Sequence, residues 1–189
     1  MRSSYSLFAF LISIVCFSCS ENTLEVDQPE MEVLPYFDLK GFIDKEINEL
    51  GTVTVIKNSR INGEEKSVEQ IYTPEDWKKE LAIFVEADIN KPTYALSYST
   101  EVDTKYLIHE LKEGEKGRLK NMTISYGEDE VTFLKIRLKK ESIFYTSTTN
   151  ASLYFSANTF NIDHYSIETT QKVIFMSPYN VKISGVIRK

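Results

Sequence analysis

From Thr93 to the C-terminus, apolar residues recur at every second position instead of with the spacing of a helix. In Leu134–Leu138 they alternate with Lys135 and Arg137, and Val181–Ile187 follows the same pattern. Successive side chains of a strand point to opposite faces, so this alternation predicts strands with one buried and one solvated face. The turn-like breaks are short enough only to join neighbouring antiparallel strands, which predicts a meander. The predicted strands span residues 94–102, 105–111, 118–126, 130–139, 142–148, 151–157, 160–168, 171–176 and 181–188.

Some of these strands depart from simple alternation. The apolar pairs Phe144-Tyr145, Tyr154-Phe155 and Ile174-Phe175 place large side chains on both faces, so these strands are predicted to be covered on both sides or to line something apolar. A shift of apolar parity between Ile162 and Tyr165 predicts a β-bulge, and therefore curvature.

Before Thr93 the apolar period is helical in two segments. Residues 35–50 carry one apolar stripe between Pro35 and Gly51, which are typical of a helix start and a helix end. Residues 73–89 begin with Thr73 as an N-cap and again have one apolar face. Each helix has a polar back and is expected to pack one side onto something larger.

Between the helices, Asn62-Gly63 predicts a hairpin that joins strands over residues 52–58 and 65–72. The predicted fold class is therefore α+β: a curved antiparallel β-sheet meander, packed against two N-terminal amphipathic helices. At the level of fold this arrangement resembles the half-barrels that carry lipids or lipoproteins across the periplasm.

The first residues carry a secretory-signal pattern. Arg2 provides a positive start, residues 7–17 form an apolar run, and the small Ser18 precedes Cys19. The run is too short to cross a bilayer, which needs about 20 apolar residues. We therefore predict that residues 1–18 are a signal peptide that is removed.

The Ser18-Cys19 pair resembles the lipobox of bacterial lipoproteins, which implies diacylation of Cys19 and cleavage before it. The chain has Cys16 where lipoboxes favour Leu. After cleavage only Cys19 remains, so no intrachain disulfide can form, and lipidation would explain a lone exported thiol. The alternative is an ordinary secreted protein that is cut near Ser18.

Residues 19–33 are predicted to be the lipidated cysteine and an acidic, flexible tether, which fully extended would reach on the order of 40 Å. Residues 34–189 are predicted to form a single α+β domain. The predicted location is the cell envelope, with the chain lipid-anchored to the outer membrane. Both orientations of the body, toward the periplasm and toward the cell surface, are compatible with the sequence. A net charge of −6 without a Lys/Arg cluster argues against a nucleic acid partner.

Two stretches resemble a family of uncharacterised Gram-negative outer-membrane lipoproteins. The first is YFDLKGFIDKEI at residues 36–47, and the second is DWKKEL at residues 76–81, continuing to ADINKP at residues 87–92. The resemblance covers residues 34–98 and implies a tethered body of helices and sheet. It implies no activity.

Few residues suggest catalysis or metal binding. The chain has two histidines, His109 and His164, and neither lies at a spacing typical of zinc or iron ligands. A Ser-His-Asp triad can assemble in space, but no Gly-x-Ser-x-Gly elbow is present. We predict no catalytic residue, no metal and no cofactor.

The paired aromatics allow a sharper hypothesis. In one interpretation they are core; in the other they line an apolar ligand pocket between sheet and helices. A third interpretation has exposed tyrosines, Tyr94 and Tyr98 among them, binding a sugar or a protein. The candidate pocket residues are Phe144, Tyr154, Phe155, Phe160 and Phe175.

The predicted function is therefore a non-catalytic binding module of the envelope, which docks a protein or glycan partner through the sheet edge or outer face. The alternative is a carrier or sensor of a lipid-like ligand held between sheet and helices. An envelope hydrolase is a distant third.

Overall fold

The computed structural model describes residues 34–188, which belong to one compact unit. The predicted signal peptide (residues 1–18), the lipidation site Cys19 and the tether (residues 19–33) lie outside the described residues.

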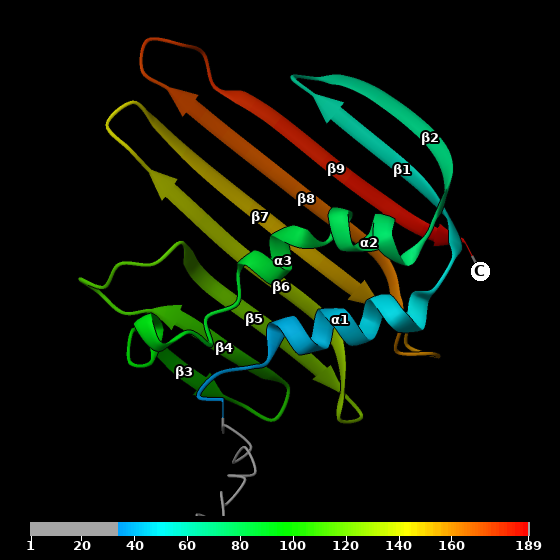
Figure 1. Cartoon of the computed structure of the whole chain (residues 1–189), viewed down its shortest axis with the longest axis horizontal. Helices are drawn as coiled ribbons and strands as arrows, with labels where there is room; N and C mark the ends of the chain where they lie inside the picture. Colours follow the sequence, from blue (N-terminus) through cyan, green and yellow to red (C-terminus); the bar gives the residue numbers. More distant parts are fainter. Residues whose placement is uncertain (1–33, 189) are drawn as a thin grey trace, which may run out of the picture. The chain divides into compact units, whose positions relative to one another are not determined.

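The body is a nine-stranded antiparallel sheet that curves and does not close (Figure 1). Its strands are β1 (Val53–Ile61), β2 (Glu64–Tyr72), β3 (Tyr98–Val102), β4 (Tyr106–Leu111), β5 (Leu119–Gly127), β6 (Glu130–Glu141), β7 (Tyr145–Phe155), β8 (Ile162–Val173) and β9 (Tyr179–Arg188).

The strand order is β2-β1-β9-β8-β7-β6-β5-β4-β3. Strands β3 to β9 therefore follow one another in sequence order, which confirms the predicted antiparallel meander. The β1–β2 hairpin turns at Asn62-Gly63 as predicted, and it joins the meander where β1 pairs with β9.

Two predicted breaks are wrong. The segments 142–148 and 151–157 are one strand, β7, and the segments 160–168 and 171–176 are replaced by β8 and the turn after it. Thr149 and Asn150, predicted as a turn, pair with Leu138 and Arg137 on one side and with Thr169 and Glu168 on the other. Their backbone groups are satisfied on both sides by neighbouring strands, and β-branched threonines fit an extended chain.

The predicted bulge is confirmed in β8. Tyr154 pairs with His164, whereas the next residue, Phe155, pairs with Ile162. Asp163 therefore has no residue opposite it, which bends the strand locally.

The helices are shorter than predicted. Helix α1 spans Leu39–Leu50, and its N-cap is Asp38, whose side chain accepts a hydrogen bond from the Gly41 N–H. The second predicted helix is two short ones, α2 (Pro74–Glu80) and α3 (Ala82–Glu86), with Thr73 and Asp76 forming a capping box before α2. A single 3₁₀ turn, Pro92–Tyr94, precedes β3, which begins at Tyr98 and not at Tyr94.

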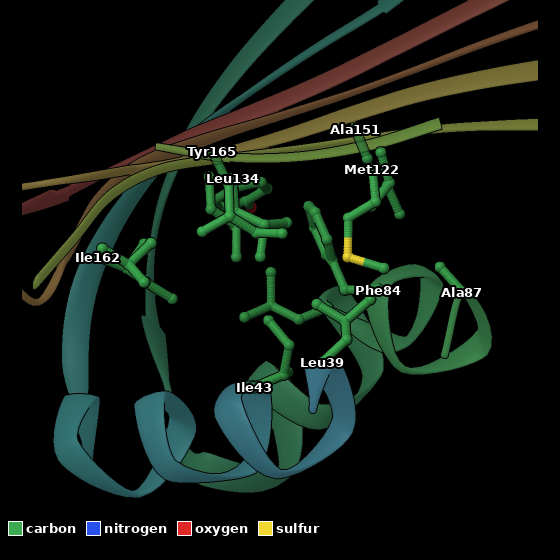
Figure 2. Close-up of a cluster of buried hydrophobic side chains, with 14 of the residues drawn as sticks. Leu39, Ile43, Phe84, Ala87, Met122, Leu134, Ala151, Ile162 and Tyr165 are labelled. Atoms are coloured by element: carbon green, nitrogen blue, oxygen red, sulfur yellow. The ribbon is translucent and has the colours of Figure 1, made fainter. Parts of the chain in front are cut away.

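The core lies between the helices and the concave face of the sheet (Figure 2). Leu39 and Ile43 of α1 and Phe84 of α3 point toward the sheet side chains of Met122 and Leu134. These five side chains are fully buried. The two sets of apolar side chains fill the space under the curved sheet.

Candidate functional site

The five predicted pocket residues lie in three different places. Phe155 is buried against Phe42 of α1, at 5.6 Å between ring centroids, and Phe160 lines a hollow of about 230 Å³ that Phe42 also borders. Tyr154 lies on the opposite face of the sheet. Phe144 and Phe175 are exposed in turns at the far end of β7 and β8. Phe155 and Phe160 thus both lie near Phe42, but the five residues do not line a common hollow in residues 34–188.

Charged side chains border the hollows at the surface of the described body. One hollow of about 460 Å³ is lined by residues of β1, β2 and β9, and Arg60, Glu65, Lys66 and Lys182 are among them. Such a lining does not match an apolar ligand, for which pockets are mostly hydrophobic. Its residues are Asn58, Ser59, Arg60, Glu65, Lys66, Ser67, Lys182 and Ser184.

Tyr98, predicted as one of the exposed tyrosines, is instead part of the core. Its hydroxyl donates a 2.9 Å hydrogen bond to the Leu119 carbonyl, and its ring packs edge-on against Tyr36 and Tyr94. Burial raises the pKa of Tyr98 above its ordinary value. Tyr98 therefore cannot stack on a sugar, and Tyr94 remains only partly accessible.

A row of side chains does cross the outer face, the face of the sheet away from the helices. Phe133, Tyr154, His164 and Val186 are directly opposite one another on β6, β7, β8 and β9. Residues that are directly opposite share one face of a sheet. Their sequence neighbours Leu134, Leu153 and Tyr165 are buried on the other face. We call these four side chains the outer-face row.

The rings of the outer-face row are in contact. The Tyr154 and His164 rings stack with centroids 4.2 Å apart and planes 11° apart, and the Phe133 ring lies 4.9 Å from that of Tyr154. His164 Nδ1 is 2.9 Å from the Asp163 carboxylate, so the bulge residue orients the imidazole. Tyr154 and Val186 are exposed.

Sequence reasoning named Tyr154 and His164 for other roles and missed the row. Its four members come from four strands, and only the pairing register aligns them. The signal available in the sequence was the departure from alternation at Tyr154-Phe155.

The other histidine is structural. His109 is buried on β4, its Nε2 accepts a hydrogen bond from the Phe37 N–H, and its Nδ1 is 2.9 Å from the Thr100 hydroxyl. Because Nε2 accepts, the proton lies on Nδ1. Burial lowers the pKa of His109, which favours this neutral form. Within residues 34–188 no three His, Cys, Asp or Glu side chains are grouped so that they could hold a metal ion.

A polar cluster links α2 to the sheet beneath it. The Glu80 carboxylate accepts hydrogen bonds from Lys57 at 2.7 Å, Tyr165 at 2.8 Å and Tyr72 at 3.2 Å. Burial lowers the pKa of Lys57, but its hydrogen bonds with Glu80 and Tyr72 outweigh that effect and leave the pKa raised. Burial, followed by the charge of Glu80, raises the pKa of Tyr165. Both raised pKa values favour the protonated forms of Lys57 and Tyr165, which donate these hydrogen bonds.

No protein-family model matches the chain, and no curated protein matches it. None of the helices between residues 34 and 188 is long and apolar enough to cross a membrane.

Proposed function

We propose that the protein is an outer-membrane lipoprotein, anchored through Cys19, whose body is a non-catalytic binding module for an envelope protein or glycan. In this proposal the body acts like a half-barrel whose concave side is occupied by its own helices. The observation that supports it is the outer-face row: an aromatic surface open to solvent on the side of the sheet that the helices leave uncovered.

The geometry of the row suits recognition of a flat, partly apolar partner. Aromatic rings offer large contact areas with little loss of side-chain freedom on binding, and the polar edges of Tyr and His supply hydrogen bonds. The Asp163 carboxylate beside His164 adds an acceptor at the rim. A sugar ring or a partner's apolar side chain fits this combination.

The filled core gives less support to the alternative of a lipid-like ligand held between sheet and helices. Trp77, Phe84 and Tyr165 are fully buried in the space that such a ligand would occupy. The hollows that remain at the surface are bordered by charged groups.

In-cell photo-crosslinking tests the proposed surface. A benzophenone amino acid at position 154 should form an adduct with a protein or a glycan, and the same group at exposed Leu96 should not. Replacing Phe133 and His164 by Ala should remove most of the adduct at position 154, because the partner would lose its neighbouring contacts. An equal yield at positions 154 and 96 would contradict the proposal.

A further inference from the structure

Two neighbouring turns form an apolar end of the sheet. One joins β6 to β7 and the other joins β8 to β9, and Figure 1 shows them side by side at the upper left. The Ile174 N–H donates a 2.9 Å hydrogen bond to the Phe144 carbonyl, which links the two turns directly. Five side chains at this end, Ile143, Phe144, Ile174, Phe175 and Met176, are called the apolar tips.

The apolar tips are exposed. Ile143, Phe144, Phe175 and Met176 are between 67% and 103% exposed, and Ile174 is 46% exposed. Four large side chains that contribute so little to the core have no packing reason to be apolar. A cluster of this kind on a folded protein marks a contact with another surface.

The backbone fixes these side chains in place. The Ser142 hydroxyl accepts hydrogen bonds from the N–H groups of Phe144 and Tyr145, at 3.3 and 3.2 Å. Phe175 has φ of 63°, a left-handed conformation that is unfavourable for a bulky residue. The fold thus bears a conformational cost at Phe175, the most exposed of the five side chains.

Tyrosine and lysine residues follow the apolar tips along the strands. Tyr145 and Tyr179 begin β7 and β9, Lys140 Nζ lies 5.8 Å from the centre of the Tyr145 ring, and Lys172 is next to Val173 at the end of β8. Residues 139–146 and 170–180 together contain three lysines and one glutamate, in a chain whose net charge is −6. The positive charge therefore gathers at the apolar end.

We propose that the apolar tips insert into the interface of a lipid bilayer, with Lys140 and Lys172 against lipid phosphates. The order from the tip inward, aliphatic and Phe, then Tyr, then Lys, matches the order of hydrocarbon, interface and headgroup in a bilayer. This attachment goes beyond the proposed function, and it uses residues other than the outer-face row.

Vesicle sedimentation tests the inference. Residues 20–189 should bind vesicles of phosphatidylethanolamine and phosphatidylglycerol, and the Phe144→Ser, Phe175→Ser double variant should bind at least tenfold more weakly, since two large apolar side chains are lost. The matched control is Ile71→Ser with Val102→Ser, two similarly exposed apolar residues at the opposite end of the sheet. This control should bind as the unchanged protein does.

The contribution of charge has its own variant. Replacing Lys140 and Lys172 by Gln should weaken binding about fivefold per lysine on anionic vesicles and leave binding to neutral vesicles unchanged.

A fluorescent probe reports which end is inserted. Residues 20–189 contain no cysteine, so an environment-sensitive dye can be placed on Ser177→Cys, directly after Met176 of the apolar tips, or on Thr104→Cys in the turn between β3 and β4. Vesicles should shift the emission to the blue only at position 177. An unchanged spectrum at 177, or vesicle binding unaffected by the two serines, would overturn the proposal. Crosslinking of position 177 to a protein in cells, without vesicle binding, would assign the tips to a protein interface instead.

Discussion

At the scale of single residues, Glu46 is a carboxyl group on the core-facing side of α1. It is buried beside Ile43 and Ile47, and one oxygen accepts a hydrogen bond from the Ile162 N–H. Within residues 34–188 its Oε2 has no hydrogen-bond partner. Burial, with a further contribution from the charges of Glu49 and Glu130 against that of Lys45, raises the pKa of Glu46 to about 7.

This raised pKa predicts a pH dependence of stability. Since the folded pKa is above the unfolded one, protonation of Glu46 stabilises the fold fully below about pH 4.5, and this stabilisation is lost as the pH rises through about 7. The difference between the folded and the unfolded pKa of Glu46 corresponds to about 3 kcal/mol in the free energy of unfolding. Urea unfolding of the Glu46→Gln variant should therefore show a gain at pH 8 that disappears at pH 4.5.

Asp44→Asn serves as the control for this experiment, because Asp44 lies exposed on the same helix. It should follow the pH dependence of the unchanged protein. A Glu46→Gln variant that is less stable than the unchanged protein at pH 8 would contradict the raised pKa.

The sequence contained a signal for Glu46 that the helical period could have revealed. Glu46 is three residues after Ile43 and four before Leu50, so it falls within the apolar stripe of α1. The size of the effect could not be predicted, because Glu130 and Ile162 approach from strands far along the chain.

At the scale of elements, Glu80 ties α2 to three strands. Removing its carboxylate leaves Lys57, Tyr72 and Tyr165 without their common acceptor in a partly buried site. Glu80→Ala should therefore lower the free energy of unfolding by about 2 kcal/mol.

Glu86 provides the matched comparison. It forms an ion pair with Arg118, and both side chains are about half exposed. Glu86→Ala should cost less than about 0.5 kcal/mol, because exposed pairs contribute little. Equal losses for the two variants in urea unfolding would show that Glu80 does not hold α2 in place.

Helices and strands could be predicted where a local sequence pattern determines them, and not where the structure depends on pairing between strands. Alternation in residues such as Leu134 to Leu138 predicted a meander strand, and the parity shift after Ile162 predicted the bulge. The attachment of β1 to β9 leaves no local trace in either strand. Thr149 and Asn150 look like a turn until strands on both sides supply their hydrogen bonds.

At the scale of the whole molecule, the proposed anchor and the proposed tips are separable attachments. Replacing Cys19 by Ala removes the site of acylation, and buried acyl chains contribute about 0.8 kcal/mol per methylene. A larger share of this variant than of the unchanged protein should be in the soluble envelope fraction when cells are fractionated, because only the proposed tips still attach it to the membrane.

A second variant separates the two attachments. Cys19→Ala combined with Phe144→Ser and Phe175→Ser should be fully soluble. If this triple variant remained in the pellet after a high-salt wash, the anchor at Cys19 would be wrong.

The sequence identifies large aromatic residues but does not show which of them share a surface. Four of the five predicted pocket residues, all except Phe160, belong to adjacent apolar pairs, and such pairs also occur in exposed turns and on the outer face. Phe144 and Phe175 are far apart in sequence and lie at the same end of the sheet only because β7 and β8 pair there, where Tyr145 is opposite Val173. The same strand pairing brings Lys140 and Lys172, which are also far apart in sequence, to this end of the sheet.

The open sheet has a further consequence if the protein is anchored to a membrane as proposed. Molecules confined to two dimensions collide often, and unpaired strand edges invite one copy to extend the sheet of the next. Edge strand β2 carries Glu64, Glu65, Lys66 and Glu69, and the other edge, β3, has five residues. The charged side chains of β2 and the short length of β3 both disfavour pairing with the edge strand of a neighbouring copy.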